Sequence, residues 1–319
     1  MVHSWRSSKM PETLDDSFPF YIVDVFTEGG KKYTGNQLAV VRNARSLSQS
    51  QKQSIAREMH FSETSFILSD EKRGNGFDVR IFTPGTELPF AGHPTLGTAL
   101  VIQQETIKRA IGSLYLNLRI GQIPVSIFYK EGRVVRELWM RQKDPSFKGD
   151  GSHSIRDLAT VLGIGEDLFD RRFPVEDVST GLPTTIIPLK SLKAVRRARV
   201  NQSAYFDYVK DREAKGILIF SSETYNHRNH LNARFFAESY GVSEDPATGS
   251  ANGCLAGYLM KNRYFKSDVL KNIIRVEQGY EIGRPSMLLL KAIRDRTEKK
   301  KIHVQVGGNA RIIASGTLI

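Results

Sequence analysis

The sequence predicts a mixed α/β or α+β protein built from two similar halves. Three observations lead to this fold class: a phrase that occurs twice, strand and helix patterns that recur in the same order, and a length of 319 residues. That length corresponds to about two domains. A repeat of roughly half the chain indicates duplication of a whole domain rather than a short-period solenoid.

The repeated phrase pairs Arg80 with Arg234 and His93 with Asp245. Arg-x-Phe occurs at Arg80 and again 154 residues later at Arg234. A polar-Pro-x-x-Gly-hydroxyl-Ala cluster begins at His93 and again 152 residues later at Asp245. The two copies differ in their titratable residue. Different titratable groups at matching positions predict one active site at the junction of the two halves.

The elements of the first half follow from hydrophobic periodicity and turn residues. Ser48 is a helix cap, and the apolar residues after it recur at helical spacing. Glu63 lies between that helix and the next strand. Pro94 suits the first turn of a helix, because an N–H there has no intrahelical partner. The predicted strands are 20–26, 37–41, 66–68, 77–82, 114–118, 125–129 and 134–140, and the second helix is 94–104.

The second half repeats the scheme after a polar, proline- and glycine-containing segment at 144–152, which we take as the boundary. Its predicted helices are 154–162, 202–210 and 246–261, and its strands are 184–188, 217–220 and 232–237. We therefore divide the chain into a disordered extension (1–17), a first half (18–143), a second half (144–300) and C-terminal strands that pack back on the first half (301–319).

Composition narrows the function classes. Hydrophobic residues make up 40% of the chain and charged residues 25%, as in ordinary globular proteins. No apolar run reaches the roughly 18 residues that span a bilayer, and the N-terminal extension lacks the apolar core of a secretory signal. The single cysteine, Cys254, excludes an intramolecular disulfide and fits a reducing compartment. We expect a cytoplasmic protein without a membrane partner.

The net charge is +12, and basic residues cluster at 190–215 and 291–301. A basic surface attracts anions, including nucleic acids. However, no zinc-finger spacing or aromatic RNA-binding phrase accompanies the charge. We interpret both clusters as solvated surface and expect no nucleic-acid partner.

The two predicted helix starts suit a small anionic substrate. A helix N-terminus presents unpaired N–H groups and a partial positive charge, and glycine lets a ligand approach the backbone. Each feature also has an ordinary structural explanation. Asp245 is a common type of helix cap, His93 is a possible loop residue that bonds a carbonyl, and Glu63 is a possible capping-box partner. Cys254 is expected to be a buried packing residue. No nucleotide-binding, metal-binding or serine-nucleophile motif is present.

Several phrases together resemble the phenazine-biosynthesis PhzF-like isomerase family. They are Val23-Asp-Val-Phe-Thr27, Gly35-Asn36, Phe61-Ser62-Glu63-Thr64, Phe90-Ala-Gly-His-Pro-Thr95 with Gly97, Glu244-Asp-Pro-Ala-Thr-Gly-Ser-Ala251, Gln278-Gly279 and Gly283-Arg-Pro-Ser286. They occur in the family's order over nearly the whole chain. Gln37 departs from the family's usual proline after Gly-Asn, which should affect a turn and not the chemistry.

The resemblance implies a diaminopimelate-epimerase-like fold, in which each half is a mixed sheet curled around a central helix. It also implies a homodimer and proton transfer without a cofactor or metal. By this resemblance Glu63 is the acid/base, and His93 and Asp245 bind and polarise the substrate. Substrate binding would further involve Ser62, Gly92, Gly249 and Ser250. The related racemases use two cysteines, which are absent at these positions.

The resulting prediction is a biosynthetic, cofactor-independent isomerase that moves a proton within a small carboxylate-bearing metabolite, similar to the family's dihydro-hydroxyanthranilate isomerase. One alternative is a racemase or epimerase that uses Glu63 together with Asp245. Another is a non-catalytic binding or scaffold protein on the same fold. Neither the substrate nor the pathway follows from the sequence.

Overall fold

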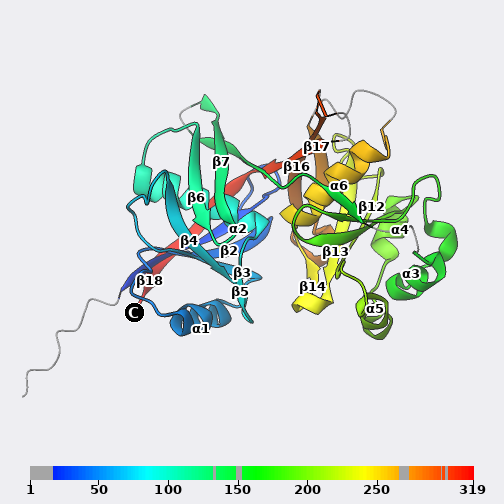
Figure 1. Ribbon diagram of the computed structural model, residues 1–319, viewed down its shortest axis with the longest axis horizontal. Helices are drawn as coiled ribbons and strands as arrows, with labels where there is room; N and C mark the ends of the chain where they lie inside the picture. The colour runs from blue at the N-terminus through cyan, green and yellow to red at the C-terminus, as the bar shows by residue number, and fades with distance from the viewer. Residues whose placement is uncertain (1–16, 132–133, 149–152, 266–272, 296, 299–300) are drawn as a thin grey trace, which may run out of the picture.

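The computed structural model describes residues 17–131, 134–148, 153–265, 273–295, 297–298 and 301–319. Apart from Ser17, the predicted extension at 1–17 lies outside the described residues. The described chain is a mixed α/β protein composed mostly of strands, with its elements gathered into two groups (Figure 1). Among the described residues, no helix is both long enough and apolar enough to cross a membrane.

One group consists mainly of elements from the first half. Its strands are β1 (Phe18–Val25), β2 (Asn36–Val41), β3 (Glu63–Ile67), β4 (Gly76–Phe82), β5 (Glu87–Leu88), β6 (Ser113–Leu118), β7 (Gly121–Tyr129) and β8 (Val135–Arg141), together with β18 (Ala310–Leu318) from the C-terminus. Its helices are α1 (Gln49–Met59) and α2 (Gly92–Val101), which continues into a π-helical turn, Ile102–Ile107.

The other group consists mainly of elements from the second half. Its strands are β9 (Ser146–Lys148), β10 (Glu176–Ser179), β11 (Pro183–Pro188), β12 (Gly216–Ser221), β13 (Leu231–Ala237), β14 (Val242–Asp245), β15 (Ile274–Gln278), β16 (Ser286–Arg294) and β17 (Ile302–Gly308). Its α-helices are α3 (Ile155–Leu162), α4 (Leu192–Arg197), α5 (Gln202–Val209) and α6 (Gly249–Lys261), and its 3₁₀ turns are Glu166–Leu168, Glu238–Tyr240 and Tyr280–Ile282.

In each group, one helix contacts four or more of the group's strands. Helix α2 contacts β1, β2, β3 and β18, and helix α6 contacts β10, β11, β16 and β17 (Figure 1). All ten residues of α2 are buried. A helix that is apolar or small on every side belongs inside a core rather than on a surface. The sequences of both helices, rich in Gly, Ala and Leu, match that position.

The strands form one continuous ladder that passes between the groups where β8 pairs with β17. Outward from this pair, one side runs β8, β7, β6, β4, β3, β2, β1, β18, and the other runs β17, β16, β15, β13, β12, β11, β10, β9. The parallel pairs fall at the same steps on the two sides: β6–β4 and β3–β2 on one, β15–β13 and β12–β11 on the other.

The local sequence accounts for helix α1. The Ser48 side chain accepts a hydrogen bond from the backbone of Gln51, whose side chain bonds back to Ser48, so the predicted cap is a full capping box. His60 ends the helix in the left-handed conformation, with φ of 54°. The last residue of helix α1 is Met59, and Glu63, the first residue of β3, follows four residues later.

The predicted starts of the two central helices are wrong by a few residues. Helix α2 begins at Gly92, so Pro94 is its third residue; helix α6 begins at Gly249, three residues after Pro246. Proline fits anywhere in the first turn, where N–H groups lack intrahelical partners, and so does not fix the first residue. In the second half, Asp245 is the last residue of β14 and pairs with Phe235 of β13, so helix α6 begins only after this strand has ended.

Candidate active site

Glu63 and His93 lie side by side at the start of β3 and the start of α2. His93 Nε2 and Glu63 Oε2 are 3.4 Å apart. Neither atom has a hydrogen-bond partner among the described residues, although both are buried. A buried polar atom without a partner is costly. A ligand atom that bonds to either group would remove that cost, so this pair marks a binding point.

Asn36, the first residue of β2, brings Asp245 to the same place. Its side-chain nitrogen lies 2.9 Å from Asp245 Oδ1, 3.0 Å from the Ala247 carbonyl oxygen and 3.2 Å from His93 Nδ1. The Asn36 side chain is buried, with 2% of its surface exposed. Asp245 therefore sits beside His93 although 152 residues separate them in the chain.

Further hydrogen bonds hold the Asp245 segment. The Thr248 hydroxyl donates to Asp245 Oδ2. The Gln278 amide donates to the Asp245 carbonyl oxygen at 2.8 Å and to the Thr248 hydroxyl at 3.1 Å. Burial raises the pKa of Asp245, and the hydrogen bonds from Thr248 and Asn36 act in the opposite direction. Both oxygens of this carboxylate therefore accept hydrogen bonds from within the protein.

The environment changes the protonation of Glu63 and His93 strongly. Burial, together with the negative charge of Asp245, raises the pKa of Glu63 to about 8. Burial lowers the pKa of His93 to about 3, although a backbone hydrogen bond with Gln37 opposes this. His93 is thus a neutral imidazole near pH 7. The Glu63 side chain keeps 16% of its surface exposed, so solvent or a substrate can reach it.

The starts of α2 and α6 meet at this site. A Cβ atom on Gly92 would lie 3.1 Å from the Gly249 Cα and 3.3 Å from the Ser250 nitrogen. A side chain at position 92 would require the facing backbone to shift by a few tenths of an ångström. Neither N-cap residue, Ala91 or Thr248, caps its helix through a side chain. Two helix starts without side-chain caps present N–H groups that suit an anion such as a carboxylate.

The structure therefore brings together most of the residues that the sequence singled out: Glu63, His93, Asp245, Gly92, Gly249 and Ser250. Ser62 precedes Glu63 in the chain and is half-buried. Cys254 is buried in α6, within 3.6 Å of the Thr180 hydroxyl, and burial raises the pKa of its thiol. A buried thiol of raised pKa is a poor nucleophile.

Sequence reasoning did not assign roles to Asn36, Thr248 and Gln278. All three belong to phrases that the sequence analysis singled out, so their presence was visible. Their contacts were not, because Asn36 meets Asp245 across 209 residues of chain and Gln278 meets it across 33.

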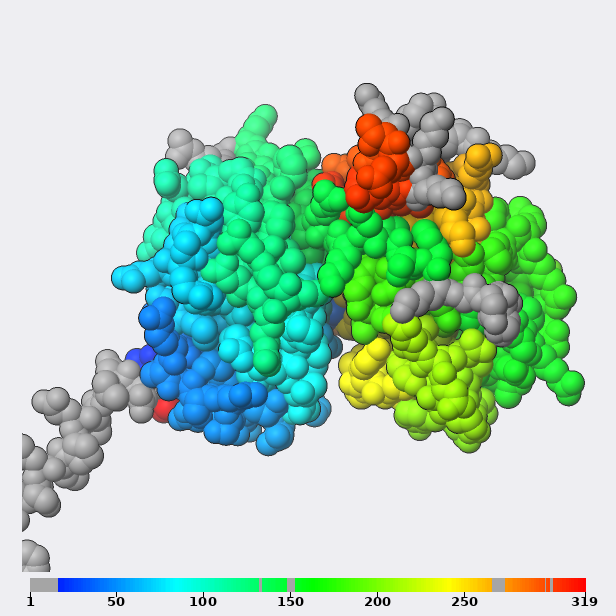
Figure 2. Space-filling view, viewed as in Figure 1, coloured from blue at the N-terminus to red at the C-terminus, as the bar shows by residue number. Residues whose placement is uncertain are grey.

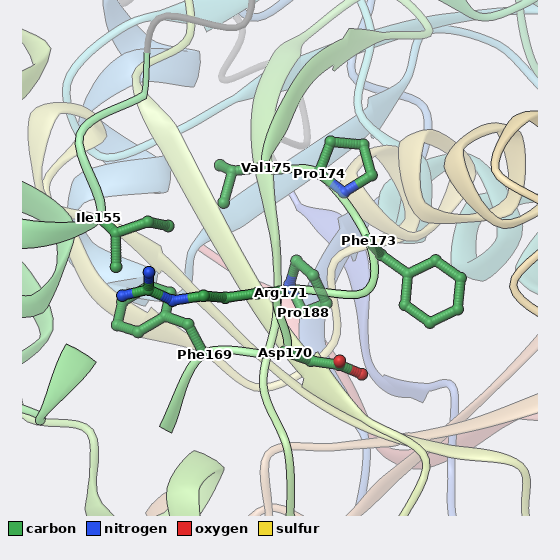
Figure 3. Close-up of a pocket in the computed structure, with 8 residues that line it drawn as sticks. All are labelled: Ile155, Phe169, Asp170, Arg171, Phe173, Pro174, Val175 and Pro188. Atoms are coloured by element: carbon green, nitrogen blue, oxygen red, sulfur yellow. The ribbon is translucent and has the colours of Figure 1, made fainter. Parts of the chain in front are cut away.

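The described surface has a notch beside the Asp245 strand (Figure 2) and a cavity away from the site. Figure 2 shows a notch between the two groups of elements, bordered on one side by β14, the strand that ends at Asp245. Figure 3 shows a cavity of about 190 Å³ in the second half, lined by Ile155, Phe169, Asp170, Arg171, Phe173, Pro174, Val175 and Pro188. None of the candidate site residues lines this cavity, so it is separate from the active site.

Comparison with known proteins defines the class. The chain is similar in structure to a probable proline racemase of Agrobacterium radiobacter, with a TM-score of 0.60 over 95% of this chain and 93% of the other, at 8% identity. That likeness shows the fold alone. It is also similar to a PhzF-family phenazine biosynthesis protein of Bacillus anthracis, with a TM-score of 0.84 and 28% identity over 95% of this chain and 99% of that one. The fold is therefore the diaminopimelate-epimerase-like class.

The family follows from the sequence comparisons. Residues 23–316 match the family described as phenazine biosynthesis-like protein. The trans-2,3-dihydro-3-hydroxyanthranilate isomerase of Pseudomonas aeruginosa is 33% identical over 297 residues, which cover 93% of this chain and 98% of the relative. The chain belongs to the phenazine-biosynthesis PhzF-like family, as its motifs predict, and by homology it is an isomerase.

Proposed function

We propose that this protein is a cofactor-independent isomerase that moves a proton within a small, carboxylate-bearing metabolite, in the manner of a dihydro-hydroxyanthranilate isomerase. The observation that carries the proposal is the pair Glu63 and His93, with facing side-chain atoms that are buried, 3.4 Å apart and without hydrogen-bond partners. A pKa of about 8 lets Glu63 occupy both protonation states near neutral pH. An acid/base that must first take and then return a proton needs that property.

The proposed reaction is a proton shift within one molecule. Ionised Glu63 takes a proton from a substrate carbon: the C–H bond breaks and an O–H bond forms. The C–H electron pair forms a new π bond to the neighbouring unsaturated carbon, and the existing π electrons shift along the conjugated system to the carbon that is protonated next. Protonated Glu63 then delivers its proton to a different carbon of the same conjugated system. The substrate is isomerised, and Glu63 returns to its starting state, so no electron acceptor is needed.

The remaining site residues hold the substrate in this scheme. Neutral His93 can donate or accept one hydrogen bond through Nε2, its unpartnered ring atom. The starts of α2 and α6, with Gly92, Gly249 and Ser250, would bind the carboxylate. Asp245 already accepts bonds at both oxygens, which suits it to orienting neighbouring groups. Its negative charge also makes Glu63 a stronger base once ionised.

We further propose that the fold consists of two pseudo-symmetric halves derived by duplication. The strand ladder supports this, because its order and its parallel steps are the same in both directions from the β8–β17 pair. Matching ion pairs support it as well. Arg80 of β4 bonds Glu87 of β5, and Arg234 of β13 bonds Glu244 of β14. On this alignment both central helices begin at the junction of the halves. The homodimer implied by the family resemblance is part of the same proposal.

The test is turnover of trans-2,3-dihydro-3-hydroxyanthranilate in heavy water, followed by NMR and mass spectrometry. We expect an isomerised product with at most one deuterium from solvent, at the carbon that receives the proton. Glu63→Gln should lower turnover by at least about 10²-fold, the usual scale of general acid–base catalysis. The matched control is Glu58→Gln, an exposed position on α1. Near-normal turnover by Glu63→Gln would remove Glu63 from the mechanism.

A second candidate function is racemisation or epimerisation with Glu63 and Asp245 as the two bases. The observation that favours it is the electrostatic interaction between these two carboxyl groups. The hydrogen bonds that Asp245 already accepts from Asn36 and Thr248 weigh against it. Solvent deuterium at both the donor and the acceptor carbon would identify a second base. Cys254→Ser should leave activity intact in either case.

A further inference from the structure

The segment from Gln278 to Ser286, which contains two of the phrases singled out in the sequence, has no part in the proposed proton transfer. It lies in the second half, between β15 and β16, and includes the turn Tyr280–Ile282. One end of the segment contacts the Asp245 loop, and the other end contacts the first half. It therefore touches both sides of the site.

The Arg284 end binds the first half. Arg284 Nη2 lies 2.7 Å from Asp24 Oδ1 and 3.2 Å from the Thr34 carbonyl oxygen, and its Nε lies 3.0 Å from the Gly35 carbonyl oxygen. The Gly35 N–H donates to the Pro285 carbonyl oxygen at 3.0 Å. The Asp24 side chain is fully buried, so Arg284 compensates a buried charge. These bonds fix the backbone immediately before Asn36.

Asn36 makes the reciprocal connection. It belongs to the first half, and its side chain donates to Asp245 Oδ1 and to the Ala247 carbonyl oxygen in the second half. Arg284 and Asn36 thus cross between the halves in opposite directions, and they are joined by other bonds between the halves, such as Tyr280 to Glu28 and Gln142 to the Gly249 carbonyl oxygen. The two connections are neighbours, because Arg284 binds at Gly35 and Asn36 is the next residue.

The Gln278 end supports Asp245 from behind. The Gln278 amide donates to the Asp245 carbonyl oxygen. A Cβ atom on Gly279 would lie 2.6 Å from the Pro246 carbonyl oxygen and 2.4 Å from that of Arg284, and φ at Gly279 is +79°, so this position requires glycine. The residues that hold Asn36 and Asp245 are therefore attached to one short piece of chain.

We propose that Asn36 and Arg284 are positioning residues that couple the approach of the two halves to the placement of Asp245 beside Glu63 and His93. The inference rests on the proposed function and deepens it. The contact from His93 through Asn36 to Asp245 exists only while the halves are together. Loss of either the Asn36 contacts or the Arg284 contacts should therefore separate Asp245 from His93, while the groups that transfer the proton are unchanged.

The hydrogen bond between Asn36 and Asp245 also has an electrostatic consequence. The hydrogen bond from Asn36 lowers the pKa of Asp245, and the charge of Asp245 raises that of Glu63. Without Asn36, Asp245 should therefore titrate at higher pH. Carbon-13 NMR of labelled Asp carboxyl groups measures this titration and needs no substrate.

The experiment compares Asn36→Leu and Arg284→Gln with the control Arg42→Gln. Arg42 forms an ion pair with Asp70 wholly within the first half; the two arginine side chains are comparably exposed, at 13% for Arg42 and 21% for Arg284, whereas Asp70 is more exposed than Asp24. Spin labels at Glu58→Cys on α1 and Asp207→Cys on α5 report the distance between the halves; both positions are exposed. We expect a narrow distance distribution for the parent and the control. For Asn36→Leu and Arg284→Gln we expect a broader and longer distribution.

Turnover supplies the second measurement. A misplacement of about 1 Å in an active site costs on the order of 10²-fold, so Asn36→Leu should lower kcat by about that factor with a smaller change in KM. Arg284→Lys should lose less turnover than Arg284→Gln, because lysine keeps the positive charge opposite Asp24. If Asn36→Leu does not fold, Asn36→Ser takes its place, since it is smaller and remains polar.

The two proposals fail in different ways. Absence of turnover by the parent protein would count against the proposed substrate and leave the spin-label and NMR measurements unaffected. A folded Asn36→Leu protein with the parent's distance distribution and the parent's Asp245 titration would overturn the positioning role. Equal broadening in the Arg42→Gln control would also overturn it, because the effect would then be general destabilisation.

Discussion

The chemistry at Glu63 depends on burial more than on any single partner. Burial is the larger cause of its raised pKa, and the charge of Asp245 is the smaller one. The same burial keeps His93 neutral. Near neutral pH, the site thus has a carboxyl group close to its pKa beside an imidazole far from its pKa. Only Glu63 of these two changes protonation readily near neutral pH.

This arrangement predicts that the Glu63 carboxyl group destabilises the fold at alkaline pH. Its pKa rises from 4.5 to about 8 on folding, so its unfavourable contribution is absent below pH 4.5 and grows as pH rises to about 8. Glu63→Gln removes the ionisable group and should stabilise the protein at pH 8 by roughly 2–4 kcal/mol, with little effect at pH 5. Thermal unfolding of both proteins at the two pH values measures this. A mutant less stable than the parent at pH 8 would contradict it.

His93 should act in the opposite direction at acid pH. Its pKa falls from 6.5 to about 3 on folding, so the protein loses stability as pH decreases between these values. The unfolded chain binds a proton there that the folded chain excludes. Considering Glu63 and His93 alone, the folded protein should therefore be most stable at an intermediate pH.

The charge of Asp245 predicts the position of the pH–rate profile. Because that charge raises the pKa of Glu63, Asp245→Asn should lower it. In the proposed mechanism the ascending limb of kcat/KM reports the ionisation of Glu63 in the free enzyme, and this limb should move to lower pH. The rate itself should fall through the loss of substrate orientation. A limb that stays in place would mean that another group titrates there.

At the scale of elements, the two central helices meet end to end through glycine. A methyl group on Gly92 would lie 3.1 Å from the Gly249 Cα and 3.2 Å from the Met140 methyl carbon. Gly92→Ala should therefore push the helix starts apart and weaken anion binding. We expect 2-aminobenzoate to raise the Tm of the parent protein and its amide to leave it unchanged. The Gly92→Ala protein should show no difference between the two compounds.

The same methyl substitution at Gly112 is the control, since no atom lies within 4 Å of a Cβ there. That variant should keep the parent's response to 2-aminobenzoate. Equal Tm shifts from the acid and the amide in the parent protein would count against an anion site between the helices.

The sequence predicted these elements well and their ends less well. Ser48 was recognisable as a cap because capping is local chemistry. The starts of α2 and α6 were placed at prolines, yet Asp245 remains in a strand because it pairs with Phe235. The repeated phrase correctly indicated that His93 and Asp245 lie together. It could not show that Asn36 joins them, because that contact depends on how the two halves meet.

At the scale of the molecule, one strand ladder runs through both groups of elements. The chain crosses from the first group to the second between β8 and β9, and returns between β17 and β18. The ladder crosses where β8 pairs with β17, and the candidate site residues lie on segments of both groups. Neither group by itself supplies Glu63, His93 and Asp245.

The pairing of β1 with β18 has a consequence for biosynthesis. These two strands join residues at opposite ends of the chain, Phe18 with Leu318. During translation, the first group lacks β18 until residues 310–318 have left the ribosome. Until then the backbone N–H and C=O groups along one edge of β1 are unpaired, and such an edge can pair with strands of other chains. A nascent chain stalled before residue 310 should therefore be sensitive to protease across the first group, whereas the released full-length chain should resist it. Protection of the stalled chain would show that the first group closes without β18.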